Sequence, residues 1–576
     1  MKTIKILFFL LLISSCAQIV APGGGARDKT SPKVLRYSPD SGQLNFHAKY
    51  IQLDFDEYIQ LKDLNNQLII SPPFEKAPEI KVKNKSLTID LSKETLLPNT
   101  TYSINFGNAL QDNNENNPLE NFKYIFSTGS YIDSLSIKGK VQTAFDHTSE
   151  KGVLVMLYSD TDDSAIYKKQ PDYFGKTKQD GTFGINNIRP GKFKIYALKD
   201  ANSDFKYSGD AESIGFVEGT VDPSEKKEIL IETFTENPKK VFLKKYNQGS
   251  YGKIMLYMNT GADSIRVKNI GVISPENELI DYSRNRDTVT YWVKNYDKDS
   301  LKLQITNDTT IIDTVEFKMI KKEDALKARK NALKLSLMNN FNGNQAFDLN
   351  AGLQLVFNNP IASINKDNAI LLNEDSIPVK NLELNTELLP ATTVNIITWD
   401  SAKAFPDPKK PGTYTVTAIR SPFRNLKEST KYHLLILPGT FTDIFGLTND
   451  SIKIDFKTRE QKFYGTLRLK VATPEMKGKY IVQLMDEKEN LIRQRSIDKT
   501  EIMDFEYLYP NKYKVKIIYD ENGNGKWDSG NFLQHVQPEK TVYNMELITI
   551  RSNWDADIEW NLVEPVKKKD TGTDKE

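Results

Sequence analysis

A stretch near the C-terminal end, D-E-N-G-N-G-K-W-D, has the residue types and spacing of a calcium-binding loop. Oxygen donors fall at positions 1, 3, 5, 7 and 9, the seventh through its backbone carbonyl: Asp520, Asn522, Asn524, Lys526 and Asp528. Position 12 is Asn531, where a bidentate glutamate would be expected. With about two negative charges, the loop predicts weak calcium binding, with a dissociation constant of roughly 10⁻⁴ to 10⁻³ M.

The same stretch also fits a tight hairpin turn. Asn-Gly occurs twice in N-G-N-G, and this dipeptide is a strong hairpin signal. The sequence leaves both interpretations open. These residues suggest weakly bound calcium as a cofactor. The function that we predict does not require a cofactor.

The sequence lacks the motifs of the common enzyme classes. Its four histidines are widely spaced and form no H-E-x-x-H motif, which argues against catalytic zinc: His47, His147, His433 and His535. A G-x-S-x-G nucleophile elbow and a phosphate-binding loop are also absent from the sequence. We therefore predict that the protein is not an enzyme.

Length and composition favour a multidomain β protein. A chain of 576 residues is too long for one hydrophobic core and suggests about three to five domains. Lysine and arginine number 78 against 76 acidic residues, so no basic surplus points to nucleic acid as a partner. Segments of alternating polarity, such as 49–59 and 192–198, are bounded by turn residues and predict antiparallel strands.

The single cysteine, Cys16, lies where a lipid anchor would be attached. Lys2 and Lys5 precede an apolar run, and I-S-S-C follows it. This pattern resembles the lipobox of bacterial lipoproteins, which implies a signal peptide at 1–15 and acyl chains on Cys16 as the membrane contact. Residues 16–30 are then a flexible tether. No acidic cluster follows Cys16, which favours the periplasmic leaflet of the outer membrane over the cell surface.

An internal repeat organises the chain. The segment R-P-G-K-F-K-I-Y-A-L-K-D at 189–200 returns as Y-P-N-K-Y-K-V-K-I-I-Y-D at 509–520, an offset of 320. T-T-Y and F-S-T, at 100–102 and 126–128, return as T-K-Y and F-K-T with an offset of 330. Because the matches occur in the same order, we predict that a two-domain unit occurs twice.

The repeat sets the domain boundaries that we expect. Five β modules are predicted: module 1 at 31–130, module 2 at 133–235, module 3 at 238–320, module 4 at 335–458 and module 5 at 460–562. Modules 4 and 5 repeat modules 1 and 2, and module 3 matches neither type. A basic linker with helical character is expected at 321–334, and a disordered tail at 563–576.

Two module types resemble known domains. Module 1, with L-D-F-D-E-Y-I, L-P-N-T-T-Y and the closing F-S-T-G, resembles the bacterial Ig-like domain of the SbsA type, as found in lipoproteins of Bacteroidota. Module 2, with D-G-T-F-G-I-N-N-I-R-P-G-K-F-K-I, is similar to the carboxypeptidase-regulatory-like or B-type β-sandwich. The resemblance implies an all-β tandem array of non-catalytic Ig-like sandwiches on an N-terminal lipid anchor. Module 5 departs from it, because Asn511 replaces the glycine and no D-G-x-F precedes it.

The repeat offers an internal comparison for the calcium loop. The matching segment of module 2 keeps Asp200, Asn202 and Asp204 but has Phe205 at the bend and Ser208 at position 9. A bulky aromatic residue disfavours the positive backbone dihedral that a glycine adopts at such a bend. We therefore expect the loop of module 5 to bind calcium better than that of module 2.

A tripeptide of Asp, then Ser or Thr, then a small or apolar residue occurs more often than the roughly two or three times that chance would give. It resembles the O-glycosylation sequon of exported Bacteroidota proteins, which implies modification of the middle hydroxyl: Ser134, Ser164, Ser264, Thr288, Ser300, Thr309, Thr314, Ser376, Ser401 and Ser451. The alternative is that Asp-Ser simply ends a turn before a strand. Both interpretations place these residues on exposed strand edges and turns.

These features predict a non-catalytic outer-membrane lipoprotein. We expect a structural or interaction subunit with a protein partner at the outer membrane, such as an accessory of a β-barrel assembly, transport or secretion complex. The alternative is a surface adhesive or carbohydrate-binding lipoprotein, which would need exposed aromatic residues at the tips of its sandwiches.

Overall fold

The computed structural model describes most of residues 28–562. The segments 328–333, 340–345, 350–352, 380–417, 422–425 and 474–478 and a few isolated positions are left out. The predicted signal peptide, Cys16, most of the tether, Ser401 and the tail 563–576 therefore lie outside the described residues. No helix in the described part of the chain has the length and apolar character needed to cross a membrane.

The all-β fold is confirmed, and the chain forms two compact units. The first unit ends at Thr233 and the second begins at Phe234, apart from the short segments 144–146 and 209–211, which belong to the second unit. Hydrophobic clusters of buried residues lie within each of the five predicted module ranges. The exact limits of the modules remain predictions.

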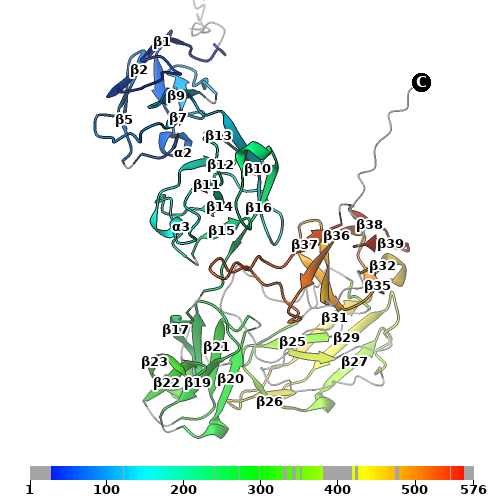
Figure 1. Ribbon diagram of the computed structural model, residues 1–576. Helices are drawn as coiled ribbons and strands as arrows, with labels where there is room; N and C mark the ends of the chain where they lie inside the picture. The colour runs from blue at the N-terminus through cyan, green and yellow to red at the C-terminus, as the bar shows by residue number, and fades with distance from the viewer. Residues whose placement is uncertain are drawn as a thin grey trace, which may run out of the picture. The chain divides into compact units, whose positions relative to one another are not determined.

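Module 1 consists of short antiparallel sheets (Figure 1). Its buried core is rich in aromatic residues. Its strands are short because Asn, Pro and Gly interrupt them at turns. The elements are β1 (Val34–Ser38), β2 (Tyr50–Phe55), β3 (Ile59–Leu61), α2 (Leu64–Gln67), β4 (Ile69–Ser71), β5 (Glu79–Lys83), β6 (Ser86–Asp90), β7 (Thr101–Asn105), β8 (Leu110–Asp112) and β9 (Lys123–Ser127). The sheet order is β1-β2-β6-β5, with β4-β7-β9 and the pair β3-β8 beside it.

Module 2 has a parallel strand pair inside an otherwise antiparallel sheet. Its first strand pairs antiparallel with β13 and parallel with the last strand, β16. The elements are β10 (Leu135–Thr143), β11 (Leu154–Tyr158), α3 (Ala165–Lys168), β12 (Tyr173–Lys176), β13 (Thr182–Ile188), β14 (Lys194–Lys199), β15 (Ser213–Phe216), η1 (Pro223–Glu225) and β16 (Glu228–Thr235). Gly181 of the D-G-T-F turn has a φ of +78°, as the tight hairpin before β13 requires.

Module 5 repeats the strand pairing of module 2 around its first strand, but its strands form two sheets, β35-β32-β39 and β34-β33-β36-β37, and an additional strand, β38, pairs with β36. Its first strand again pairs antiparallel with one neighbour, β35, and parallel with the last strand, β39. The elements are η6 (Gln461–Phe463), β32 (Gly465–Ala472), β33 (Lys479–Asp486), β34 (Leu491–Ile497), β35 (Glu501–Leu508), β36 (Asn511–Asp520), β37 (Thr541–Tyr543), β38 (Ile548–Ile550) and β39 (Asp555–Asn561). The substitution of Asn511 for glycine leaves β36 intact, since Asn511 pairs with Ile550.

Modules 3 and 4 complete the second unit. Module 3 holds β17 (Leu243–Ser250), β18 (Lys253–Met258), β19 (Ile265–Asn269), η2 (Pro275–Asn277), β20 (Glu278–Tyr282), β21 (Thr288–Val293), β22 (Ser300–Asn307) and β23 (Thr310–Lys318). The helix α4 (Lys322–Lys327) lies in the predicted linker. Module 4 holds β24 (Leu337–Asn339), β25 (Leu353–Phe357), β26 (Ile361–Ile364), η3 (Lys366–Asn368), β27 (Ala369–Asn373), β28 (Ala418–Ser421), β29 (Lys431–Ile436), β30 (Phe441–Asp443) and β31 (Ile452–Lys457).

Individual hydrogen bonds confirm the repeat of modules 1 and 4. The backbone amide of Leu97 donates to the hydroxyl of Tyr102 at 2.8 Å, and Lys427 donates to Tyr432 in the same way at 2.9 Å. Both tyrosines are buried core residues. The conserved spacing of T-T-Y and T-K-Y therefore places an equivalent tyrosine in each copy, where it ties the preceding loop to the sandwich.

An aromatic side chain joins modules 3 and 4 within the second unit. Phe445, which follows β30, packs against Tyr251 and Trp292 with ring centroids 5.3 and 6.3 Å away, and all three are buried. Gly252 makes room for it, because a Cβ at that position would lie 2.7 Å from the Phe445 ring. The ammonium of Lys322 donates to the carbonyl of Phe445 at 3.2 Å. The junction is thus a packed contact.

A carboxylate joins modules 4 and 5. Asp348 accepts hydrogen bonds from the guanidinium of Arg459 at 3.0 Å, from the hydroxyl of Tyr464 at 2.6 Å, and from the hydroxyl of Tyr509. Burial, and then the adjacent Asp348 charge, raise the pKa of both tyrosines, so they remain protonated donors. Charge-assisted bonds of this kind are stronger than neutral ones. Asp348 therefore holds two residues of module 5 and the segment that leads into it.

Replacing Asp348 with alanine should loosen this junction. The change leaves one guanidinium and two half-buried or buried hydroxyls without their acceptor, which should cost about 1–3 kcal/mol of unfolding free energy. Hydrogen exchange of the amides of residues 459–464 should become faster. Asp504→Ala is the matched control, because its pair with Arg468 is exposed at the surface and should contribute at most about 1 kcal/mol. Equal exchange rates in the two variants would contradict the assignment.

Candidate functional site

The end of β36 turns into the predicted calcium loop around one buried carboxylate. Asp520 is 1% exposed, and its two oxygens accept the backbone amides of Asn524 and Gly525, each at 2.9 Å. Gly525 has a φ of +76°, which glycine adopts without strain. The side chain of Asp520 therefore ends the strand and shapes the bend.

The other predicted ligands lie in the same loop. The amide groups of Asn522 and Asn524 both donate to one oxygen of Asp528 at 2.6 Å. The side-chain oxygen of Asn524 accepts the backbone amide of Lys526 at 2.7 Å. The structure thus brings together all five residues that the spacing singled out.

Sequence reasoning missed a second buried carboxylate in this loop. Glu539 is 7% exposed, and its oxygens accept the amides of Glu521 at 2.8 Å and Asp528 at 3.0 Å. Burial raises the pKa of Glu539, and the charges of Asp528 and Asp520 also raise it. The calcium-loop pattern calls for a glutamate at position 12, where the sequence has Asn531. Glu539 comes from beyond the loop, where no spacing rule points to it.

The matching loop of module 2 has the same construction. Asp200 accepts the amides of Ser203 at 2.7 Å and Phe205 at 2.9 Å. Glu212, which is 3% exposed, accepts the amides of Ala201 at 3.0 Å and Ser208 at 2.8 Å. With the offset of 320, Ala201 and Ser208 correspond to the two residues that donate to Glu539. Each copy therefore has a carboxylate at the start of the loop and a glutamate from outside it.

Phe205 adopts the same bend as Gly525 although a bulky residue disfavours it. Phe205 has a φ of +61°, close to the +76° of Gly525. Its ring packs at a steep angle against Phe174, with centroids 4.8 Å apart. This aromatic contact offsets the backbone strain, which is of order 1 kcal/mol. The bend therefore gives no reason for the module 2 loop to bind calcium more weakly.

Neither loop offers a ready cluster of anionic metal ligands. In the described ranges, no three side chains of the types His, Cys, Asp and Glu are placed to hold a metal ion. A calcium ion at Asp520 would therefore depend on asparagine oxygens and the carbonyl of Lys526 as well. Calcium binding remains a prediction for both loops.

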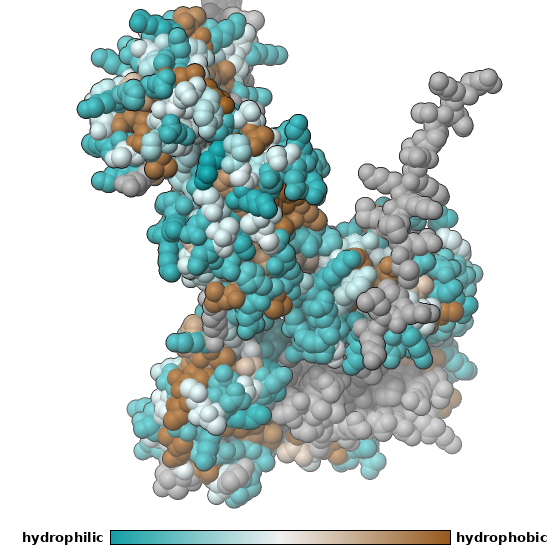
Figure 2. Space-filling view, in the orientation of Figure 1, coloured by the Kyte–Doolittle hydropathy of each residue, from teal (hydrophilic) through white to brown (hydrophobic). Residues whose placement is uncertain are grey.

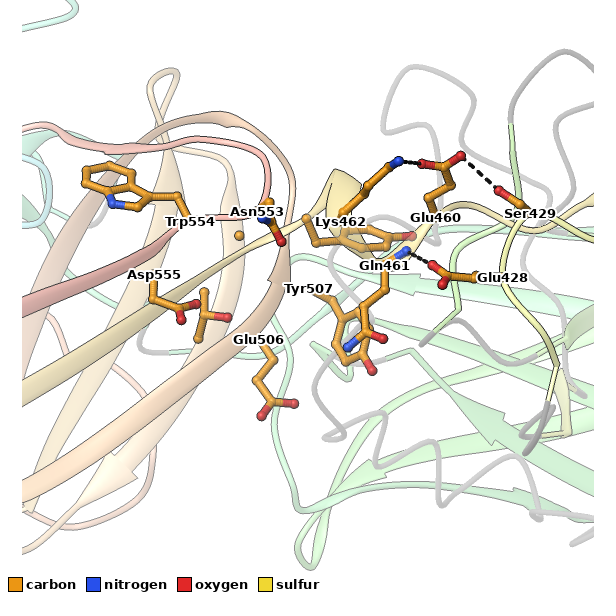
Figure 3. Close-up of a pocket in the computed structure, with 13 residues that line it drawn as sticks. Glu428, Ser429, Glu460, Gln461, Lys462, Glu506, Tyr507, Asn553, Trp554 and Asp555 are labelled. Carbon is orange, nitrogen blue, oxygen red and sulfur yellow. Dashed lines mark hydrogen bonds and ion pairs between the residues drawn. The ribbon is translucent and has the colours of Figure 1, made fainter.

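A polar pocket lies where module 4 meets module 5 (Figure 3). It has a volume of about 770 Å³ and is lined by Glu428, Ser429, Glu460, Gln461, Lys462, Tyr464, Gly465, Thr466, Glu506, Tyr507, Asn553, Trp554 and Asp555. Two of its carboxylates are part of the wall: Glu460 pairs with Lys462 at 3.0 Å, and Glu428 accepts the amide of Gln461 at 2.6 Å. In Figure 3 the ring of Trp554 points away from Gln461 and Tyr507.

A β-bulge shapes one side of this pocket. Gly465 pairs with Leu508 and Leu467 pairs with Phe505, so two residues of β35 face the single residue Thr466. They are Glu506 and Tyr507, and Tyr507 has a φ of +55°. A bulge of this kind redirects side chains, which places both residues at the pocket.

The potential glycosylation residues are not uniformly exposed. Six of the described ones are exposed: Ser134, Ser300, Thr309, Thr314, Ser376 and Ser451. Three are half-buried: Ser164, Ser264 and Thr288. Of these, Ser264 donates to the side-chain oxygen of Asn307, and Thr288 to Asp287. The expectation of exposed positions is wrong for these three, and modification of the others remains a prediction.

Comparisons with known proteins identify one part of the chain. A family model described as a bacterial Ig-like domain matches residues 28–128, which is module 1. No curated protein matches the chain in sequence. The coarser part of the expected resemblance, a bacterial Ig-like domain, is confirmed. The module 2 resemblance and a bacterial lineage within Bacteroidota remain predictions.

Several solved structures are similar to the chain at low levels. The TIE protein of Bacillus anthracis is 10% identical, with 94% of this chain and 75% of that chain covered and a TM-score of 0.15. BcpA, the major pilin subunit of Bacillus cereus, is 8% identical, with 74% and 99% covered and a TM-score of 0.15. The S-layer protein SbsC is 9% identical, with 90% and 67% covered and a TM-score of 0.13. These scores carry no argument about the function of this chain.

Asp520→Ala should abolish any calcium-dependent rise in melting temperature. A calcium concentration about 100 times the dissociation constant should stabilise the unmodified chain by about 2.7 kcal/mol. The variant also loses two backbone bonds, so the melting temperature must be measured for each protein with calcium and with chelator. Asp200→Ala tests the module 2 loop in the same way. A calcium response that survives Asp520→Ala would exclude this loop as the site.

Proposed function

We propose that the chain is a non-catalytic outer-membrane lipoprotein that acts as a structural and interaction subunit. The observation that carries the proposal is the bonded junction at Asp348, together with the Phe445 contact. A tandem array with flexible linkers could not hold its modules in a fixed order in space. Bonded junctions give the second unit the fixed geometry that a scaffold needs.

Two exposed aromatic residues of module 3 support a role in protein interaction. Phe242 directly precedes the edge strand β17 and Tyr246 lies within it, and they are 53% and 49% exposed. Figure 2 shows hydrophobic residues gathered along one side of module 3. Exposed apolar patches on soluble domains commonly mark contact sites. We propose that this side of module 3 contacts the protein partner. The chain would then be an accessory subunit of an outer-membrane β-barrel complex.

Acylation of Cys16 is the proposed attachment to the membrane. Cys16→Ser should move the protein from the membrane fraction to the soluble fraction of the cell envelope, because it removes the acyl chains. Lys29→Ala, outside the lipobox, is the control and should remain in the membrane fraction. Fractionation followed by mass spectrometry of the N-terminal peptide measures both. An unacylated N-terminal peptide in the unmodified protein would contradict the proposal.

Purification of the native protein tests the proposed partner. A tag after Lys575 and a mild detergent should recover a β-barrel protein in stoichiometric amount. Replacing Phe242 and Tyr246 with serine should reduce that recovery, because the apolar contact area is lost, whereas Ile502→Ser, an exposed residue of module 5, should not. If the unmodified protein is recovered alone, the subunit proposal fails and a surface adhesive becomes the better interpretation.

A further inference from the structure

We propose that the pocket between modules 4 and 5 binds a short saccharide. The proposal is independent of the membrane anchor and of the protein partner, since a structural subunit or an adhesive could carry such a site. Its volume of about 770 Å³ lies within the range of ligand pockets, about 300–1,000 Å³. The argument rests on the tyrosine, the exposed carboxylates and the amides that line it.

The repeat shows that Tyr507 is an unusual choice for its position. In module 2 the same bulge occurs between β10 and β13, and its left-handed residue is Asn187, with a φ of +59°. Asparagine tolerates this conformation, whereas a bulky residue there is an outlier. The bulge itself therefore belongs to the module type, and the tyrosine ring that replaces the asparagine packs edge-on against Tyr464, another residue of the pocket, with centroids 5.4 Å apart. We assign the tyrosine to the pocket that it lines, where an aromatic ring can contact the C–H face of a sugar.

Two carboxylates of the pocket are available to a ligand. Glu506 and Asp555 are both exposed. Asp555 feels the charge of Arg468, but the ion pair of Arg468 is with Asp504, at 2.8 Å. As acceptors, both suit the hydroxyl groups of a sugar. In Figure 3 Glu506, Tyr507 and Asp555 lie apart from the paired Glu460 and Lys462.

The other polar groups favour a saccharide over a simple cation. Gln461 and Asn553 carry amides that both donate and accept, and Thr466 carries a hydroxyl that does the same. A sugar hydroxyl also donates and accepts, so it can use every one of these groups. A cation would use the carboxylates and the other oxygens but would leave the N–H and O–H donors of these groups without a role.

The test is titration calorimetry of the full chain. The probes are maltohexaose, cellohexaose, chitohexaose and, as a cation, spermine. Each is titrated to a few millimolar, so that a dissociation constant of about 1 mM can be measured. We expect one or more of the oligosaccharides to bind. Tyr507→Asn should weaken that binding at least about tenfold. The variant relieves the left-handed backbone but removes the ring contact with Tyr464, so its melting temperature is measured alongside to show that it is folded. Tyr507→Phe keeps the ring and should retain binding.

Glu506→Gln provides a second variant that does not depend on the bulge. It should weaken oligosaccharide binding by removing the charged acceptor, and the exposed position should leave folding intact. Binding that is equal in the unmodified protein and in Tyr507→Asn would overturn the assignment of the site. Failure of all three oligosaccharides to bind, or binding of spermine alone, would overturn the saccharide as the ligand.

Discussion

The loops of this protein depend on buried carboxylates that accept backbone amide hydrogens. Asp112 in module 1 is 1% exposed and accepts four successive amides, from Asn114 to Asn117. Burial alone would raise the pKa of Asp112, but these amides lower it overall. Since its folded pKa lies below the unfolded value, Asp112 contributes stability above the unfolded pKa, and the contribution is lost as pH falls through the folded pKa. Short strands can therefore be joined by long loops that still have a defined conformation.

These bonds between a carboxylate and backbone amides also explain how much of the candidate calcium site could be predicted from the sequence. Spacing was sufficient to place Asp520, Asn522 and Asp528 in one loop, because a carboxylate that shapes its own turn acts over a few residues. Glu539 lies beyond the reach of any such rule, since the fold brings it back from another segment. The pocket was equally out of reach, because its walls come from two modules and from a bulge that alternation of polarity does not reveal.

Alternating polarity made the all-β architecture predictable, and the internal repeat made the duplicated two-module unit predictable. The positions at which the two copies differ were more informative than those that match. Asn511 takes the place of a glycine without disturbing the strand, so the glycine of module 2 is not a requirement of the module type. Phe205 occupies a glycine position because a neighbouring ring compensates for the strain. Backbone propensity correctly predicts that a positive φ at Phe205 costs free energy. It could not predict the contact with the Phe174 ring that offsets this cost.

The pairing of the first strand with the last also has a mechanical consequence. In module 2, β10 and β16 run parallel through six registered residue pairs, and in module 5, β32 and β39 run parallel through seven. Because the two strands are parallel, the chain enters each module at one end of the pair and leaves at the other. A force that pulls on the two chain ends would shear this pair, so that all its hydrogen bonds bear the load at once. An antiparallel terminal pair would instead open one bond at a time. Modules 2 and 5 are thus arranged to resist extension along the chain.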